Sequence, residues 1–339
     1  MESIYNYSLE EFRDILTAKG YPAYTAKQVF DWLYKKRIKD FKEMTNISED
    51  IRQLLEDNFC FFKLELIKKK ESKDKTEKFL LKLEDESVIE SVLIPKEKRN
   101  SLCVSTQVGC KFNCTFCESG KKGLKRNLKT FEIVSQYLKI ADLISPKVIN
   151  NIIFMGIGEP LDNFDNVLKA ISILTHKEGV GFGGRKITIS TCGLPSQTKR
   201  LADLSLKIKL AISLHSADDR KREELMPVNK KYSLSELKKS LKYYSDRDNY
   251  PISFEYVLLG KANTSIEDAK KLAGFLKGIK AKVNLIPYNG RDTKYSIPKK
   301  SEIDIFCREL KKRDIFFTVR EPRGQDIEAA CGQLRAKFL

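Results

Sequence analysis

Three cysteines set close together constrain this chain more than any other feature of its sequence. The stretch CVSTQVGCKFNCTFC contains Cys110, Cys114 and Cys117 in a C-x3-C-x2-C spacing. A loop this short can close three thiolates on one face of an iron–sulfur cube and leave one iron without a protein ligand. The spacing therefore predicts an inorganic centre with one open coordination position.

A structural zinc ion is the alternative occupant of this loop. Zinc would need a fourth thiolate or imidazole, and the chain has only two histidines, His176 and His215, neither close to the loop in sequence. Three thiolates followed by a basic, glycine-containing loop suit a 4Fe-4S cluster better. We therefore predict that Cys110, Cys114 and Cys117 hold a 4Fe-4S cluster.

The composition is that of a globular protein with a full core. The chain has 339 residues, of which 41% are hydrophobic, enough for one large domain and a smaller one. It has no apolar run of membrane-spanning length and no signal-peptide pattern at its start, so a cytoplasmic protein without membrane contact is expected. Eight cysteines in such a chain favour thiol or metal chemistry over a disulfide framework.

The formal net charge of +17 makes a polyanion the natural partner. Basic clusters occur at residues 35–37, 68–70 and 121–126, the last of them just past the cysteine loop. The alternative is that lysine is simply the commonest solvated residue of this chain. Charge alone leaves both interpretations open.

The first hundred residues divide into two patterns. Residues 1–60 contain three helix starts, with capping boxes at Ser8–Glu11 and Thr25–Gln28 and an N-cap at Ser48, and they predict a small helical domain. From 61 to 102 the hydrophobic period changes to two, in LELIKKKES, KFLLKLED and SVIESVLIP, which predicts an antiparallel strand extension.

From residue 103 to 339, strands and amphipathic helices alternate, which predicts a parallel sheet covered by helices. Six strand–helix units are too few for a closed eight-fold barrel, so we expect a partial barrel with its ligands at the carboxyl ends of the strands. The strand-like runs cover residues 102–106, 151–155, 186–190, 209–215, 252–259 and 282–287, with a last strand at 316–320.

Polar and glycine residues follow several of these strands and predict a ligand site. Each of them alone is more often a strand-end residue that satisfies backbone groups, but together at one rim they favour a bound ligand. The candidate binding residues are Gly158, Glu159, Ser190, Ser213, Leu214, His215 and Asn289.

Motifs along nearly the whole chain add a resemblance to a known family. The cysteine spacing, with Phe116 before the last cysteine, resembles the signature of the radical S-adenosylmethionine (SAM) superfamily. Together with GLKRNL, GIGEPLDN, LAISLHSADD, NLIPYN and RGQDIEAACGQL, it resembles the RlmN/Cfr family of radical SAM RNA methyltransferases. The resemblance implies an α/β fold with a (β/α)6 partial barrel, SAM bound at the open iron and at the strand-end residues, and methylation of adenosine in RNA.

The same resemblance gives roles to two further cysteines and one glutamate. It implies that Cys331, in AACGQL, carries a methyl group from a first SAM, and that a second SAM supplies a 5′-deoxyadenosyl radical. It implies that Cys103 releases the product through a disulfide with Cys331, and that Glu90 removes the proton from the ring carbon. By their residue types alone, Glu90 is a solvated strand glutamate and the two cysteines are small buried side chains.

Two residues place the chain within the family. Val108 and Pro160 resemble the RlmN branch, which methylates C2, whereas the Cfr branch methylates C8. The RlmN branch implies 23S ribosomal RNA and the adenosine 3′ to the anticodon of tRNA as substrates, an electron donor such as flavodoxin or ferredoxin, and a monomer. A non-catalytic RNA-binding protein with a structural cluster is the competing hypothesis from another class.

Overall fold

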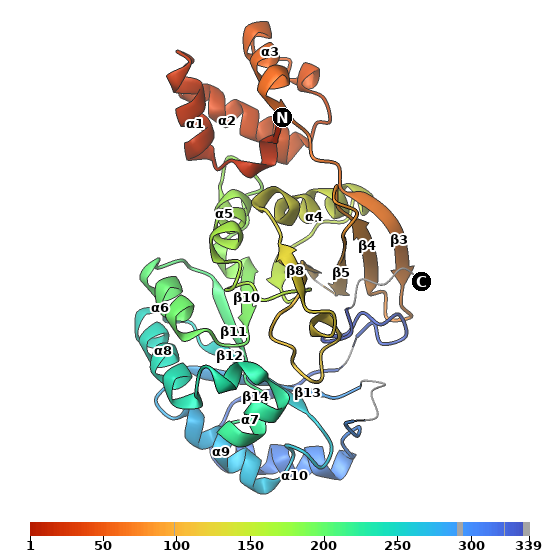
Figure 1. The fold of residues 1–339 in the computed structure, drawn as a ribbon, viewed down its shortest axis with the longest axis vertical. Helices are drawn as coiled ribbons and strands as arrows, with labels where there is room; N and C mark the ends of the chain where they lie inside the picture. Colours follow the sequence, from red (N-terminus) through yellow and green to blue (C-terminus); the bar gives the residue numbers. More distant parts are fainter. Residues whose placement is uncertain (98, 290–293, 322, 335–339) are drawn as a thin grey trace.

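A single sheet of ten strands organises the protein (Figure 1). The computed structural model describes residues 1–97, 99–289, 294–321 and 323–334. The strand order is β14-β13-β12-β11-β10-β9-β6-β5-β4-β3, so the sheet follows the chain except where β7 and β8 leave it. Its strands are β3 (Glu65–Glu71), β4 (Glu77–Lys82), β5 (Val88–Lys96), β6 (Arg99–Cys103), β9 (Asn151–Phe154), β10 (Ile187–Thr191), β11 (Lys209–Ser213), β12 (Ile252–Leu258), β13 (Ala281–Pro287) and β14 (Phe317–Val319).

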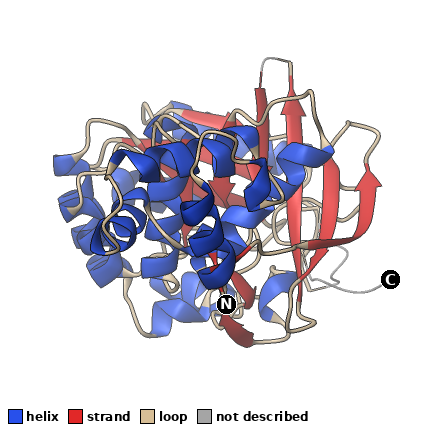
Figure 2. Cartoon of the chain, turned by 90° about the horizontal axis from the view of Figure 1, so that it is seen from above, coloured by secondary structure: helices blue, strands red, loops and turns tan. Residues whose placement is uncertain are grey.

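The run from β6 to β14 is parallel throughout and forms the partial barrel that the alternation predicted. Figure 2 shows the helices gathered over this part of the sheet. Among the described residues, no helix combines the length and the apolar character that crossing a membrane would need. The connecting helices are α4 (Thr130–Leu143), α5 (Phe164–Thr175), α6 (Pro195–Asp203), α7 (Asp219–Leu225), α8 (Leu234–Arg247), α9 (Ile266–Leu276) and α10 (Lys300–Lys311).

Strands β3 to β5 form the predicted antiparallel extension, and they belong to the same sheet as the barrel. β5 pairs antiparallel with β6, with Val92 opposite Cys103. The extension therefore continues the barrel wall instead of standing apart from it. A separate small hairpin, β7 (Gln107–Gly109) with β8 (Leu124–Asn127), brackets the cysteine loop.

The first sixty residues form the predicted helical unit. Its helices are α1 (Leu9–Ala18), α2 (Tyr24–Phe30) and α3 (Glu49–Asn58), and short strands β1 (Glu2–Ser3) and β2 (Phe59–Cys60) pair its two ends. Ser8 caps α1 in a capping box, as predicted. The box at Thr25 is wrong, because α2 already begins at Tyr24 and Thr25 lies buried inside it. Ser48 is the N-cap residue of α3, but its side chain accepts no capping hydrogen bond.

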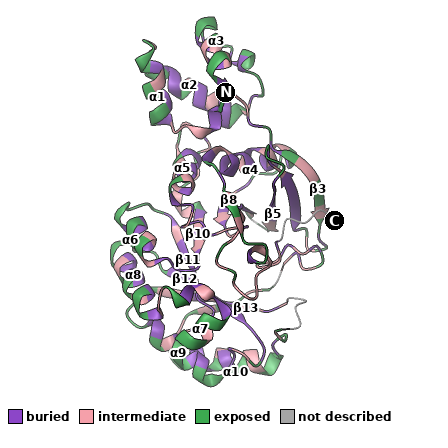
Figure 3. Ribbon diagram, viewed as in Figure 1, coloured by how far each residue is buried: buried purple, intermediate pink, exposed green. Residues whose placement is uncertain are grey.

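This helical unit packs on the barrel helices through aromatic and charged contacts. The rings of Phe30 and His176, which follows α5, lie 6.3 Å apart, and Arg37 and Lys39 both form ion pairs with Asp142 at the end of α4. Figure 3 shows buried inner faces and exposed outer faces on the helices of both units. Shorter helical turns cover Ile4–Asn6, Asp31–Lys36, Phe41–Glu43, Glu118–Gly120, Gly184–Lys186 and Pro227–Lys230.

Candidate active site

The cysteine loop is held in shape by its own backbone. The N–H of Cys110 donates to the Gly123 carbonyl oxygen at 3.0 Å, and the N–H of Cys117 donates to the Cys114 carbonyl oxygen at 3.0 Å. Gly109 has φ of +79°, and a Cβ atom there would lie 2.0 Å from the Gly123 oxygen. Only glycine allows this close approach of the two sides of the loop.

The three thiols of the loop lie close enough to one another to affect each other's pKa. Burial raises the pKa of Cys110 to about 12, and it also raises the pKa of Cys114 and Cys117. Within the described residues, no three His, Cys, Asp or Glu side chains are arranged around a point as ligands of a single metal ion. Soft thiols without other donor types suit the irons of an iron–sulfur cluster, whose binding removes their protons.

The predicted strand-end residues lie at the carboxyl ends of the parallel strands β9, β10, β11 and β13, and these ends form one rim of the sheet. Glu159 is buried there, and its two carboxylate oxygens accept from the N–H groups of Leu161, at 3.0 Å, and Cys192, at 2.7 Å. Burial raises the pKa of Glu159 while these hydrogen bonds oppose the shift. The carboxylate therefore ties two strand-end loops together, and its contact with SAM stays a prediction.

His215 joins this edge to the cysteine loop. Its ring lies 4.7 Å from the ring of Phe116, and its Nδ1 accepts from the Val257 N–H at 3.0 Å. Burial, with a smaller effect of Arg222, lowers the pKa of His215 to about 3. The imidazole is therefore neutral, with its proton on Nε2.

Arg222 is a functional candidate that the sequence did not reveal. It is fully buried, and it donates to the carbonyl oxygens of Leu214 at 3.1 Å and Cys192 at 2.6 Å, and to Asn229 Oδ1 at 2.8 Å. These bonds fix the ends of β10 and β11. Burial lowers the pKa of Arg222, while Cys192 and Cys114 oppose the shift. In the sequence, DDRKREEL is typical of a solvated helix, so no pattern marked this arginine as buried.

The C-terminal segment, residues 323–334, folds back across the molecule to the cysteine loop. At one end, Gly324 N–H donates to Asp74 Oδ2 at 2.9 Å in the turn between β3 and β4. At the other end, Glu118 N–H donates to the Gly332 carbonyl oxygen and Ser119 Oγ donates to the Leu334 carbonyl oxygen, both at 2.8 Å. The strand extension and the cysteine loop thus hold the segment that contains Cys331.

This segment brings Cys331 to Cys103, although more than two hundred residues separate them in sequence. Cys331 is exposed, whereas Cys103 is buried on β6. Burial raises the pKa of Cys103 to about 12, and the nearby Cys331 adds to the shift. Burial raises the pKa of Cys117 in the cysteine loop, and Cys331 adds to that shift. Cys331 is also the largest cause of the raised pKa of Arg320, which follows β14. Cys103 also packs in one cluster with Ile327, Ala329 and Leu334 of the C-terminal segment, so the two cysteines named by the family resemblance lie in the same part of the molecule.

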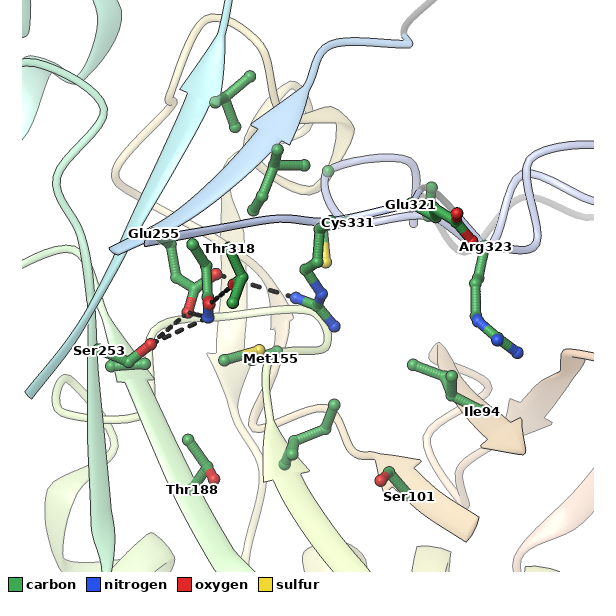
Figure 4. Close-up of a pocket in the computed structure, with 18 of the residues that line it drawn as sticks. Ile94, Ser101, Met155, Thr188, Ser253, Glu255, Thr318, Glu321, Arg323 and Cys331 are labelled. Carbon is green, nitrogen blue, oxygen red and sulfur yellow. Dashed lines mark hydrogen bonds and ion pairs between the residues drawn. The ribbon is translucent and has the colours of Figure 1, made fainter. Parts of the chain in front are cut away.

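A large cavity opens beside Cys331, inside the barrel (Figure 4). It encloses about 1140 Å³, and its wall includes Phe116 and Glu118 of the cysteine loop. Of the predicted site residues, Cys331 and Asn289 line it, and Gln333 Nε2 donates to the Asn289 carbonyl oxygen at 3.3 Å. The volume suits a ligand of the size of a nucleoside or larger.

Many of the other lining residues are basic. Lys96, Arg99, Lys209, Lys282 and Arg323 all contribute to the wall. Burial and neighbouring cations lower the pKa of Lys96 and Lys209. Basic residues outnumber the glutamates of the same wall, which are Glu118, Glu255, Glu321 and Glu328, and this excess of positive charge favours an anionic ligand.

Glu90 is buried on β5, close to the C-terminal segment. Its carboxylate forms an ion pair with Lys78 at 3.2 Å, and Lys78 also donates to the Glu328 carbonyl oxygen at 3.1 Å. Glu90 shares a face of β5 with Val92, which packs in one cluster with Cys103. The solvated alternative is therefore wrong, but the cavity wall does not include Glu90, and its role as a base stays a prediction.

Comparisons with known proteins agree with this architecture. Residues 104–276 match the family model "Radical SAM superfamily", and residues 3–61 match "Ribosomal RNA large subunit methyltransferase N-terminal domain". The crystal structure of a radical SAM methyltransferase from Sphaerobacter thermophilus superimposes with a TM-score of 0.93 at 37% identity, covering 99% of this chain and 100% of that one. Fold and site thus define a radical SAM methyltransferase.

Curated relatives narrow this assignment to one family. Proteins named "Probable dual-specificity RNA methyltransferase RlmN" are 43% identical in Staphylococcus carnosus (strain TM300) and 44% identical in Bacillus anthracis (strain A0248). Each alignment covers 99% of this chain and 93% of the relative. The chain belongs to the RlmN family of radical SAM methyltransferases.

Proposed function

We propose that this protein methylates C2 of adenosine in RNA, with Cys331 as the carrier of the transferred carbon. The proposed substrates are 23S ribosomal RNA at the peptidyl transferase centre and the adenosine 3′ to the anticodon of tRNA. The observation that supports this most is the approach of Cys331 to Cys103 beside the cysteine loop, at the wall of a cavity of nucleoside size. The protein acts in the cytoplasm as a monomer.

Cys110, Cys114 and Cys117 would hold one 4Fe-4S cluster, and the strand-end residues would hold SAM beside it. When bound, these groups supply the methyl group and, from a second SAM and an electron from a flavodoxin or ferredoxin, a 5′-deoxyadenosyl radical. The adenine C2 carbon is electron-poor, so it does not attack a methyl cation equivalent by itself. A radical route that starts from a protein-bound methyl group avoids this difficulty.

Cys331 and Cys103 are proposed to have different roles in the reaction, in keeping with their different exposure. The exposed Cys331 sulfur accepts the methyl group, because a thiolate is the most nucleophilic common side chain at neutral pH. After the carbon is joined to the base, the Cys103 sulfur attacks the Cys331 sulfur and the bond between Cys331 and the carbon breaks. The electron pair of that bond stays with the carbon, which takes up a proton to become the methyl group of the product; a disulfide forms, and a reductant must restore both thiols.

The base that removes the C2 proton is proposed to be Glu90. Its side chain is buried in an ion pair with Lys78, and Lys78 donates to the Glu328 carbonyl oxygen in the segment that contains Cys331. The helical domain of residues 1–60 and the basic cavity wall are proposed to contact RNA phosphates.

A trapping experiment tests this proposal. Wild-type protein and the variants Cys103→Ala and Cys331→Ala are reconstituted anaerobically and incubated with SAM, a reductant and unmodified ribosomal RNA. We expect 2-methyladenosine with the wild type, a covalent protein–RNA adduct with Cys103→Ala, and neither with Cys331→Ala. Methylation by Cys331→Ala would contradict the carrier role, free RNA alone with Cys103→Ala would contradict the resolving role, and 8-methyladenosine would contradict the C2 assignment.

A further inference from the structure

A buried carboxylate in the cavity wall has an oxygen atom without a hydrogen-bond donor. Glu255, on β12, is only 5% exposed and lines the cavity. Its Oε1 accepts from Ser253 Oγ at 3.0 Å and from Asn284 Nδ2 at 2.8 Å. Its Oε2 is buried and accepts no hydrogen bond from any described residue. Buried polar atoms of this kind are uncommon, and they point to a group that the cavity receives from outside.

Neighbouring side chains fix the direction of this carboxylate. Asn284 Nδ2 also donates to Ser253 Oγ at 3.0 Å, and Thr318 Oγ1 donates to Asn284 Oδ1 at 2.8 Å. Figure 4 shows Ser253, Glu255 and Thr318 together in the wall of the cavity that also contains Cys331. Turning the Glu255 carboxylate would break both bonds of Oε1, so Oε2 keeps its position.

Arg320 lies opposite this free oxygen. Its Nη1 is 3.8 Å from Glu255 Oε2, which is an ion pair but too long for a hydrogen bond. Its backbone N–H donates to the Leu285 carbonyl oxygen at 2.8 Å and fixes the residue at the end of β14. An acceptor that lacks a hydrogen-bond donor and a partly exposed cation therefore lie side by side in the wall.

We propose that Glu255 and Arg320 read the Watson–Crick edge of the target adenine, with Glu255 Oε2 accepting from the 6-amino group and Arg320 donating to N1. This inference rests on the proposed function. Adenine presents a donor at position 6, whereas guanine presents an acceptor there, which the carboxylate would repel. The pair therefore selects adenine over guanine by the order of its donor and acceptor.

The same contact explains which ring carbon is methylated. Carbon C2 is bonded to N1, so a base whose N1 bonds Arg320 carries C2 on the Arg320 side of the site. Arg320 and Cys331 both line this cavity, and Cys331 is the largest cause of the raised pKa of Arg320. A base bound through its other edge, by the 6-amino group and N7, would instead bring C8 toward Arg320.

Two RNA oligonucleotides that differ only at the target nucleotide test the inference. One has adenosine and the other has purine riboside, which lacks the 6-amino group. For the wild type, we expect removal of the amino group to lower kcat/KM and RNA affinity by about 10- to 100-fold. In Glu255→Gln, the two donors on Oε1 keep the amide oxygen in place, so an NH2 group faces the amino group of the base. This variant should lose a similar factor on adenosine and discriminate between the two RNAs by less than about threefold.

Controls separate the inference from folding and from SAM binding. Glu321→Gln removes another carboxylate from the same cavity wall and should keep the full preference for adenosine. RNA affinity is measured by fluorescence anisotropy without reductant, and the Kd for SAM is measured separately on the reconstituted protein. Glu255→Gln should leave the Kd for SAM and the thermal midpoint unchanged.

Two results would overturn the inference. Full preference for adenosine in Glu255→Gln would mean that the carboxylate does not meet the base, and weakened SAM binding with full preference would assign it to the cofactor. In both cases, RNA methylation by the wild type would leave the proposed function intact. Because the affinity measurement needs no turnover, it tests Glu255 even if the wild type failed to methylate RNA, which would refute the proposed function itself.

Discussion

Replacing Gly109 by alanine should prevent the cysteine loop from closing, whereas the same change at Gly123 should have little effect. The two glycines lie at the two ends of the cysteine loop, both with positive φ, +79° for Gly109 and +71° for Gly123. A Cβ atom at Gly109 would lie 2.0 Å from the Gly123 oxygen, while one at Gly123 would have no neighbour within 4 Å. The pair therefore separates steric overlap from backbone strain.

The size of the difference follows from these contacts. Alanine in the left-handed region costs about 1 kcal/mol at either position. At Gly109, the Gly123 carbonyl must also retreat by about 1 Å, with an overpacking cost of about 1–3 kcal/mol. That movement breaks the 3.0 Å hydrogen bond from Cys110 N–H, worth about 1 kcal/mol. We expect a loss of about 3–5 kcal/mol for Gly109→Ala and about 1 kcal/mol for Gly123→Ala.

Urea unfolding of the metal-free protein, followed by circular dichroism, measures the two losses. Iron and sulfide content after anaerobic reconstitution then reports whether each loop still accepts its cluster. Gly109→Ala should incorporate far less iron than Gly123→Ala. Equal stability and equal iron content in the two variants would refute the steric account of the loop.

Three further predictions concern thiols and a buried ion pair. Cys110→Ser should abolish cluster absorbance while Cys307→Ser, on α10, retains it. Burial raises the pKa of Cys103 from 9.0 to about 12. The contribution of the buried thiol to stability is therefore complete below about pH 9 and falls by about 1.4 kcal/mol per pH unit above it. Urea midpoints measured from about pH 8 to about pH 10 should fall less steeply in Cys103→Ala than in the wild type. Lys78→Met should cost about 3 kcal/mol in urea unfolding because it removes both the buried ion pair with Glu90 and the hydrogen bond to the Glu328 carbonyl oxygen, whereas Lys82→Met, in exposed pairs, should cost less than about 1 kcal/mol.

Local patterns predicted the parts of this fold that local physics determines. The alternation of strands and helices gave the parallel sheet, because a strand buried on both faces needs helices around it. Ser8 caps α1 as its capping box predicted. Thr25 does not cap α2 as predicted, because the turn at Pro22 already starts this helix. The Thr25 N–H donates to the Pro22 carbonyl oxygen at 3.0 Å.

Local sequence patterns predicted only part of the candidate site. The cysteine spacing defined the loop, and strand ends defined the edge beside it, but no spacing relates Cys103 to Cys331. Their approach depends on the contacts of Gly324 with Asp74 and of Gly332 with Glu118, which join three distant parts of the chain. Family motifs supplied that pairing where physical reasoning from the sequence could not.

Glu255 and Arg320 were missed for a different reason. Glu255 is a single carboxylate in the strand run ISFEYVLL, and such a residue on a strand buried along its whole length is a signal that could have been followed. Arg320 is one of many basic residues in a chain of net charge +17, so nothing in its local sequence distinguishes it. Only the tertiary structure brings the two within 3.8 Å.

A pulse–chase measurement tests the central claim most directly. The reconstituted protein is first methylated with SAM that carries an isotopically labelled methyl group, and excess SAM is removed. Unlabelled SAM, reductant and RNA are then added for a single turnover, and the RNA nucleosides are analysed by mass spectrometry. We expect the labelled carbon to leave Cys331 and appear in 2-methyladenosine. Unlabelled 2-methyladenosine, with the label still on Cys331, would contradict it.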